Sequence, residues 1–284
     1  MSSPYVSVII PSRDDTHLPS TLASLEAQEG APAFEVVVVA SPDRSIPGRL
    51  EFWRDRLGLR VVEASGSTAG AQRNYGVAAS RGALLLFVDS DDTVGEAYVR
   101  AMADALEMHE LVCSCVDTTV LNPWVREETH PQQTGLIVAE MAFLPFAGAG
   151  TLGIGRPLFE EIRGFDPLLP CYEEADLCWR IQLAGHEPPV WVPEAKLHYR
   201  LEQHGAERWR KATAFGQVQA LLYRRYRSAG VPRESVRGAV VAWANLLWRL
   251  LRRVARHSTR GEGWQAAIRW GRLRGSVRHR VPYF

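Results

Sequence analysis

Short segments made almost wholly of apolar residues recur through the first 120 positions, and each except the last is followed by a stretch with helical patterning. Strands are predicted over residues 5–10, 34–39, 59–62, 83–88 and 111–116. Helices are predicted over residues 19–28, 47–57, 68–80 and 95–107. Strands without a polar face must be covered on both sides, and helical connections between strands favour parallel pairing. The alternation therefore predicts an α/β fold, a mostly parallel sheet flanked by helices.

Polar residues stand at the ends of three of these strands. The three groups are Pro11-Ser12-Arg13, Ala40-Ser41-Pro42 and Asp89-Ser90-Asp91. In sheets of this kind, ligands bind in the crevice outside the carboxyl ends of the strands. We therefore expect the three groups to converge on one binding site.

The third group is strongly acidic, because Asp89, Asp91 and Asp92 follow an apolar strand within four positions. Three carboxylates held together repel one another and favour a cation between them. Hard oxygen ligands suit Mg²⁺ or Mn²⁺, and such ions also hold substrate phosphates. The alternative is that these residues cap a helix beginning near Val94, where carboxylates stabilise the helix dipole.

The rest of the chain divides into a mixed region and a helical one. Polar residues 122–133 and Gly-rich residues 143–154 read as loops, followed by a helix over 176–184 and short strands at 190–192 and 196–199. From Gly205 onwards, helices are predicted over 205–228, 233–257 and 263–279. Residues 207–284 hold 18 basic and 3 acidic side chains, whereas residues 1–206 hold 15 and 29. The two regions should therefore face different partners.

The predicted helix within residues 237–257 is amphipathic and basic, and tryptophans occur in and after it. Such a helix can lie on an anionic membrane surface. Residues 233–284 can equally form a contact in a homo-oligomer, or pack against the rest of the chain. No nucleic-acid-binding motif accompanies the positive charge, so no nucleic-acid partner is expected.

Composition indicates the compartment. The four cysteines match neither a zinc spacing nor a disulfide framework, which indicates reduced thiols and a cytoplasmic protein. No apolar run is long enough to span a bilayer, and residues 1–4 lead straight into a strand without a signal-peptide pattern. We expect a soluble protein, or one peripheral on the inner face of the membrane.

Four segments together resemble the family 2 glycosyltransferases of the GT-A fold. They are VSVIIPSR (6–13), AGAQRNYGVAASRG (69–82), LLFVDSDD (85–92) and YEEADLCWRIQLAGH (172–186). The resemblance covers residues 5 to 200 and implies a Rossmann-like GT-A catalytic domain over 1–204. Within it, residues 1–118 would bind the nucleotide sugar and 119–204 the acceptor, with residues 205–284 as a helical extension.

The resemblance also implies roles for individual residues. Asp89 and Asp91 match the Asp-x-Asp motif that binds the metal, Mn²⁺ or Mg²⁺, and the diphosphate, with Asp91 as the direct ligand and Asp89 nearer the ribose. His198 falls where family members place a histidine that completes the metal shell. Arg73 would meet the phosphates or the base of the donor. The neighbouring Pro11, Ser12, Arg13, Ser41 and Ser90 would line the nucleotide-sugar site.

Three acidic residues at the start of the helix predicted over 176–184 match the family's catalytic acids. Glu174 stands at the general-base position of inverting members, between Glu173 and Asp176. The usual residue there is aspartate, so Asp176 is a second candidate for the base. Many members also carry two aspartates after the second strand, one of which recognises uracil. Ala40-Ser41 replaces them here, so a uridine donor is not assured, and deoxythymidine or guanosine remains open.

These observations predict a metal-dependent glycosyltransferase that moves a sugar from a nucleotide-diphosphate donor to a hydroxyl acceptor with inversion. The acceptor would be a glycan, a lipid-linked molecule or a natural product. One alternative is a sugar-nucleotide nucleotidyltransferase, although no glycine-rich, lysine-bearing triphosphate loop is present. Another is a catalytically silent sugar- or partner-binding scaffold, suggested by Ala40-Ser41 and Glu174.

Overall fold

The structure is a computed structural model of the 284-residue chain. It describes residues 5–12, 16–41, 50–64, 68–125, 130–138, 141–201, 205–233, 237–238, 240–241, 243–245, 248 and 262–284. The chain forms two compact units. The sheet unit comprises residues 1–138, 144–169 and 173–201, and the helical unit comprises 139–143, 170–172 and 202–284.

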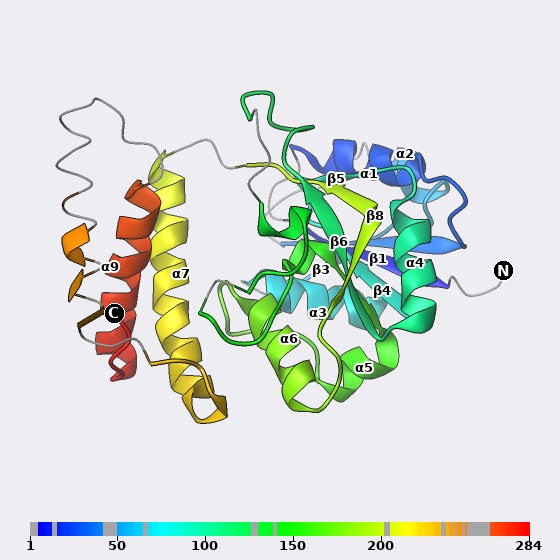
Figure 1. Cartoon of the computed structure of the whole chain (residues 1–284). Coiled ribbons are helices and arrows are strands. Elements are labelled where there is room, and N and C mark those ends of the chain that lie inside the picture. The colour runs from blue at the N-terminus through cyan, green and yellow to red at the C-terminus, as the bar shows by residue number, and fades with distance from the viewer. Residues whose placement is uncertain are drawn as a thin grey trace. The chain divides into compact units, whose positions relative to one another are not determined.

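An eight-stranded sheet in the order β3-β2-β1-β4-β7-β6-β8-β5 forms the centre of the sheet unit (Figure 1). The strands are β1 Val6–Ser12, β2 Phe34–Ala40, β3 Arg60–Glu63, β4 Leu84–Phe87, β5 Thr93–Val94, β6 Leu111–Asp117, β7 Leu152–Gly155 and β8 Val190–His198. The pairs β1·β2, β1·β4, β2·β3 and β6·β8 are parallel, and β7 runs antiparallel to both its neighbours. The predicted α/β class and mostly parallel sheet are confirmed.

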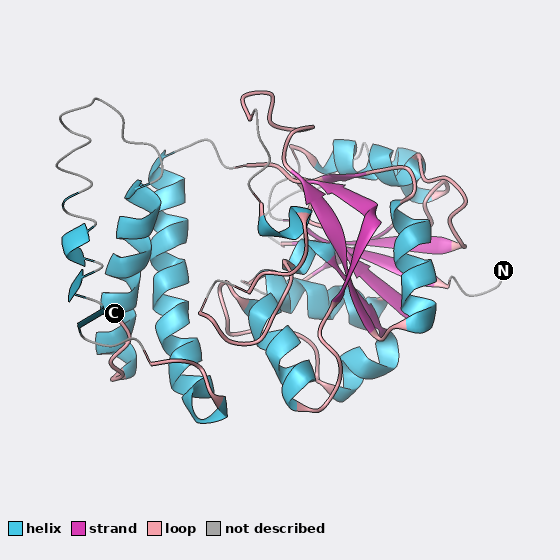
Figure 2. Ribbon diagram, viewed as in Figure 1, coloured by secondary structure: helices cyan, strands magenta, loops and turns pink. Residues whose placement is uncertain are grey.

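Helices surround this sheet (Figure 2). They are α1 Leu18–Glu26, α2 Glu51–Arg54, α3 Ala69–Ala79, α4 Tyr98–Met108, α5 Arg156–Glu161 and α6 Glu173–Leu183. Helix α3 begins at Thr68, whose hydroxyl accepts from the Ala71 amide at 3.1 Å as an N-cap. It then crosses β1 very closely, because a Cβ added at Gly76 would lie 2.4 Å from Ile9 Cγ2. This close crossing keeps the first turns of α3 near the strand ends.

The core explains why the strands were recognisable. All seven residues of β1 are buried, as are six of the seven in β2 and all four in β4. Helix α4 covers one side of the sheet with Tyr98, Val99, Met102 and Leu106. Strands buried on both faces show a nearly continuous apolar sequence.

Some expectations about local structure were wrong. Val94 lies in strand β5, and α4 starts only at Tyr98, with Ala97 at its N-cap and no capping side chain. The interpretation of Asp89 to Asp92 as a helix cap is therefore excluded. The strands predicted at 190–192 and 196–199 are one strand, β8, with an irregular register opposite Ser114 and Cys115.

Other elements were not predicted or differ in length. Strands β5 and β7 and helix α5 were missed, since β5 has two residues and β7 contains two glycines. Helix α2 is shorter than the predicted 47–57, part of which lies outside the described residues. The predicted helix over 233–257 also lies largely outside them, with helical backbone at 237–238, 240–241, 243–245 and 248.

In the helical unit, α7 (Gly205–Tyr226) and α9 (Glu262–His279) pack so closely that their backbones touch. A Cβ at Gly216 would lie 2.0 Å from the Ile268 carbonyl oxygen, and one at Gly271 would lie 2.1 Å from that of Thr213. Glycine is thus required at both positions. Among the helices that the structure describes, none is both long and apolar enough to cross a bilayer.

Candidate active site

The three polar groups expected to converge lie at the carboxyl ends of β1, β2 and β4. Ser12 is in register with Ala40, and Ile9 with Phe87, so these parallel strands end at one edge of the sheet. Pro11 and Ser12 are the last, buried residues of β1. Ser41 follows β2, and its hydroxyl accepts a hydrogen bond from Gln72 Nε2 at 3.0 Å. Arg13, assigned to the same site from the sequence, lies outside the described residues.

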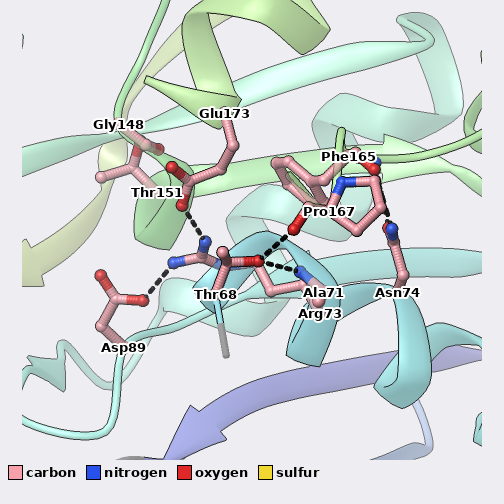
Figure 3. A network of polar contacts seen from close by, with 10 residues as sticks. All are labelled: Thr68, Ala71, Arg73, Asn74, Asp89, Gly148, Thr151, Phe165, Pro167 and Glu173. Carbon is pink, nitrogen blue, oxygen red and sulfur yellow. Dashed lines mark hydrogen bonds and ion pairs between the residues drawn. The ribbon is translucent and has the colours of Figure 1, made fainter. Parts of the chain in front are cut away.

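Arg73 joins three of the predicted site segments (Figure 3). Its Nη1 donates to Glu173 Oε1 at 2.8 Å and its Nη2 to Asp89 Oδ1 at 2.5 Å. The side chain is 2% exposed. Burial lowers the pKa of Arg73, but the Asp89 and Glu173 carboxylates outweigh it and raise the pKa overall. The guanidinium is therefore a permanent positive charge that links α3, the acidic loop after β4 and the start of α6.

A second set of bonds fixes α3 to the segment before α6. Asn74 makes two hydrogen bonds to Phe165, donating to its carbonyl at 2.8 Å and accepting from its amide at 3.0 Å. The Thr68 hydroxyl donates to the Pro167 carbonyl at 2.9 Å. Two neighbouring residues of α3 therefore attach it to the segment that leads into α6 (Figure 3). Arg73 does so through an ion pair with Glu173, and Asn74 through hydrogen bonds to the backbone of Phe165.

The acidic loop itself is held from two distant parts of the chain. The buried Thr21 hydroxyl lies 2.9 Å from the Ser90 carbonyl oxygen and 2.6 Å from that of Asp92, and shares its single proton between them. Arg200 donates its amide to Asp92 Oδ1 at 2.8 Å and its Nε to the Asp91 carbonyl at 2.9 Å. These bonds leave the Asp91 side chain exposed. Neither Thr21 nor Arg200 was identified from the sequence, because their role depends on tertiary contacts.

Asp92 differs from its neighbours in the loop. It is 1% exposed, and burial, followed by the charges of Asp91 and Asp89, raises the pKa of its carboxyl well above the usual value. Its Oδ1 accepts the Arg200 amide, so Asp92 helps to hold the loop. Asp89, half-buried, and Asp91, exposed, remain the two carboxylates at the surface of the loop.

The Gly-rich segment predicted as a loop lies against the acidic loop. A Cβ at Gly150 would lie 2.7 Å from Asp89 Oδ2, so a larger residue there would displace this carboxylate. The segment is held by the fully buried Gln132, which accepts from the Gly148 amide at 2.6 Å and donates to Thr151 Oγ1 at 2.8 Å. Gln132 was also missed in the sequence, where it stands in an apparently ordinary polar loop.

His198 lies at the end of β8, opposite Thr93 of β5. Its Nδ1 is 3.2 Å from the Thr93 hydroxyl. Burial lowers its pKa, against a smaller opposing effect of Asp117, so the imidazole is neutral near pH 7. A neutral imidazole and an exposed carboxylate such as Asp91 are suitable donors for a divalent cation.

The number of protein donors is nevertheless small. Within the residues described, no group of three or more His, Cys, Asp or Glu side chains is placed to hold a metal ion. Mg²⁺ commonly takes one or two carboxylates from the protein and its remaining ligands from phosphates and water. A cation held here by Asp91 and His198 would therefore take its remaining ligands from a phosphorylated molecule and water.

The three acidic residues at the start of α6 differ in environment. Glu173 is buried against Arg73. Asp176 is fully buried and accepts from Arg180 Nε at 2.8 Å. The same guanidinium donates to the carbonyl oxygens of Ile162 and Gly164 at 2.6 and 2.7 Å. Of the three acids, Glu174 alone is half-exposed.

This chain matches the sequence profile of a known protein family and is similar in fold to several solved structures. The sequence profile described as Glycosyl transferase family 2 matches residues 7–161. No curated protein sequence matches the chain. Among solved structures, a mannosyltransferase from Pyrobaculum calidifontis in complex with GDP-Man and Mn²⁺ is similar, with a TM-score of 0.61, 17% identity, and coverage of 98% of this chain and 87% of that one.

Structures of TarS from S. aureus are also similar. Residues 1–349 of TarS in complex with UDP-GlcNAc give a TM-score of 0.55 and 19% identity, with 97% of this chain and 92% of that one covered. Against a longer TarS structure, the alignment covers 78% of this chain but only 43% of that one. At these identities the likeness shows a shared fold.

Proposed function

Because this chain belongs to glycosyl transferase family 2 and is a glycosyltransferase of the GT-A fold, we propose that it moves a sugar from a nucleotide diphosphate to a hydroxyl group with inversion. The observation that carries this proposal is the Arg73 bridge, which joins Asp89 on the expected donor side to Glu173 on the expected acceptor side. The family match favours this function over nucleotidyl transfer and over a catalytically silent scaffold.

We assign the general base to Glu174. Its carboxylate would take the proton of the acceptor hydroxyl while that oxygen attacks the anomeric carbon and the bond to the diphosphate breaks. A base must be ionised and within reach of its proton. Glu173 and Asp176 are both buried and bound to arginines, whereas Glu174 is half-exposed. Attack opposite the leaving group inverts the configuration.

On the donor side, we propose that Asp91 and His198 hold Mn²⁺ or Mg²⁺, with Asp89 beside them. The bound cation would neutralise the charge that develops on the departing diphosphate. Arg73 already pairs with two carboxylates, so it would orient Asp89 in addition to the phosphate contact expected from the sequence. Pro11, Ser12 and Ser90 would line the sugar-nucleotide site.

The base of the donor would be met by Ser41, which is paired with Gln72. This pair is uncharged, so it carries no carboxylate of the kind that would recognise uracil. The similar structures are described with UDP-GlcNAc in one case and GDP-Man in the other. We therefore propose a nucleotide-diphosphate sugar as donor, without preferring uridine over guanosine or deoxythymidine as its nucleoside.

We also propose that the helical unit lies on an anionic membrane surface at the inner face, close to a lipid-linked or other hydroxyl-bearing acceptor. On α9, Trp270, Leu273 and Val277 are exposed at helical spacing, with Arg274 and Arg278 exposed beside them. Exposed apolar residues flanked by arginines suit an interface with anionic lipids. The double variant Trp270→Ser/Val277→Ser should weaken co-sedimentation with anionic vesicles. A homo-oligomer is the competing outcome, seen as a concentration-dependent mass and unchanged co-sedimentation.

The catalytic proposal is tested by incubating the full chain with a panel of nucleotide sugars and Mn²⁺ or Mg²⁺, and measuring nucleotide diphosphate release. Glu174→Gln should retain donor binding and lose about 10²–10⁴-fold in transfer, the usual contribution of a general base. Glu160→Gln is the matched control, since Glu160 is 63% exposed on α5. A fully active Glu174→Gln enzyme would place the base elsewhere.

Asp91→Asn tests the donor side. It should lose metal-dependent nucleotide binding while the fold is retained, because the Asp91 side chain is exposed. Binding that is unchanged in the presence of Mn²⁺ would remove Asp91 from the metal site. A folded wild-type protein that releases no nucleotide from any donor in the panel would contradict the proposed reaction as a whole.

A further inference from the structure

The turn that precedes β7 lies directly against Asp89. It consists of Gly148 and the short 3₁₀ helix Ala149–Thr151, and the chain then enters β7, which pairs antiparallel with β4. A Cβ added at Gly150 would lie 2.7 Å from Asp89 Oδ2 and 2.8 Å from Asp89 Cγ. The backbone of Gly150 is not left-handed, so the lack of space beside Asp89 is what requires glycine at this position.

A closed ring of hydrogen bonds holds this turn in place. The Gly148 amide donates to Gln132 Oε1 at 2.6 Å, and Gln132 Nε2 donates to Thr151 Oγ1 at 2.8 Å. The Thr151 hydroxyl donates in turn to the Gly148 carbonyl at 2.6 Å, which closes the ring. A buried polar network in which every member has its partner is rigid, so the turn has one preferred arrangement.

Gln132 is itself fixed within the sheet unit, to which all of these residues belong. Its side chain is fully buried, and that of Thr151 is also buried, so water does not compete for the ring. The Gln132 carbonyl accepts from Trp191 Nε1 of β8 at 2.9 Å, and the Gln132 amide donates to His130 Nδ1 at 3.2 Å. The turn beside Asp89 is therefore connected to β8 through a single glutamine.

These contacts restrict the Asp89 carboxylate on two sides. Arg73 Nη2 donates to Oδ1, while Gly150 lies against Oδ2. The ion pair alone would hold one oxygen and leave the other able to move towards the turn. With the turn in place, the part of the Asp89 side chain that remains exposed has a fixed orientation.

We propose that Gln132 and Thr151 are positioning residues for glycosyl transfer: their hydrogen-bond ring holds Gly150 against Asp89 and so orients this carboxylate towards the donor. The inference rests on the proposed place of Asp89 beside the metal on the donor side. Reacting groups and the residues that hold them are sensitive to displacements of about 1 Å. Gln132 lies in the part of the chain expected to bind the acceptor, and yet it would act on recognition of the donor.

The test compares Thr151→Val with Thr151→Ser in the full chain. Valine keeps the shape of threonine and loses both hydrogen bonds of the hydroxyl, whereas serine keeps both bonds and loses a methyl group. Thr151→Val should raise the donor KM about tenfold, the order expected when a charge-assisted contact is partly lost, with the acceptor KM unchanged. Thr151→Ser should resemble the wild type, and Gln132→Leu should reproduce the effect of Thr151→Val.

A general loss of folded protein gives a different result, because it lowers kcat and leaves both KM values unchanged. That pattern in Thr151→Val would overturn the inference. A Thr151→Ser enzyme with a donor KM as high as that of Thr151→Val would overturn it as well, since the hydroxyl would then not be the group that matters.

Thermal unfolding gives a second measurement that does not depend on the reaction. Gly150→Ala should lower Tm in the otherwise wild-type chain, because the added Cβ meets the Asp89 carboxylate. In an Asp89→Ala background that carboxylate is absent, so the same change should lower Tm much less. Equal losses in the two backgrounds would show that the turn does not constrain Asp89. If the wild type transfers no sugar, the proposed function fails, whereas this comparison still decides whether the turn fixes Asp89.

Discussion

Replacing Arg73 with leucine should destabilise the sheet unit by an amount that follows from the exposure of its two partners. Removing one member of a buried ion pair costs about 3–5 kcal/mol, because the other charge is left without compensation. The Asp89 side chain is 34% exposed, so water compensates most of its loss, whereas Glu173 is only 8% exposed. We therefore expect about 3 kcal/mol, nearly all from Glu173. In a domain of this size, that lowers Tm by about 6–12 °C.

The assay is thermal and urea unfolding of Arg73→Leu, Glu173→Leu and the double variant, followed by circular dichroism. Apolar replacement of both partners of a buried pair is often close to neutral. The double variant should therefore be more stable than Arg73→Leu by at least about 1 kcal/mol. An Arg73→Leu protein within about 1 kcal/mol of the wild type, or a double variant in which the two losses add, would refute this account of the bridge.

Three further predictions concern other parts of the structure. Burial lowers the pKa of His130 to about 4 in the folded protein. Between about pH 6.5 and pH 4, the histidine is therefore protonated in the unfolded chain but neutral in the folded one, so the free energy of unfolding falls as the pH falls. About 2 kcal/mol of stability should be lost between pH 7 and pH 5. Urea unfolding midpoints measured at pH 7 and pH 5 should show a smaller loss of stability in His130→Asn than in the wild type. An equal loss in the two proteins would contradict the role given to His130. Gly271→Ala should lower Tm because its Cβ meets the Thr213 carbonyl, whereas Gly263→Ala, with open space around it, should not; similar shifts would rule out the close helix contact. Thr21→Val should raise the Mn²⁺ concentration for half-maximal activity severalfold by releasing the acidic loop, and an unchanged metal titration would argue against that role.

Much of the fold follows from local sequence. Strands such as β1 and β2 are buried on both faces and therefore show as mostly apolar runs, in which the buried Ser7 and Glu35 bond to each other. Strands β5 and β7 do not, because a two-residue bridge and a segment with two glycines carry too little pattern. The edges of the sheet beyond β4 thus depend on tertiary pairing that no short window of sequence reveals.

The candidate site divides in the same way. The sequence predicts a helix over 176–184, whereas α6 begins at Glu173, so all three acids lie in its first turn. Helical geometry then puts Glu173 and Asp176 on one face, three residues apart, with Glu174 rotated away from it. With the helix start placed correctly, their different exposures were within reach of the sequence. The identities of the arginines that bind Glu173 and Asp176 were not, and neither were the contacts of Thr21, Gln132 and Arg200, since each joins segments separated by long stretches of chain.

The attachment of the acidic loop to Thr21 on one side and Arg200 on the other has a consequence for how the protein is made. A ribosome delivers the chain from its N-terminus, so β1 and β4 can pair while Arg200 is still unsynthesised. Contacts between such distant residues form late, because the intervening chain must first be closed into a loop. The nascent chain therefore acquires a sheet well before it acquires a finished acidic loop, and nascent chains halted before residue 200 should fold their first strands yet lack activity.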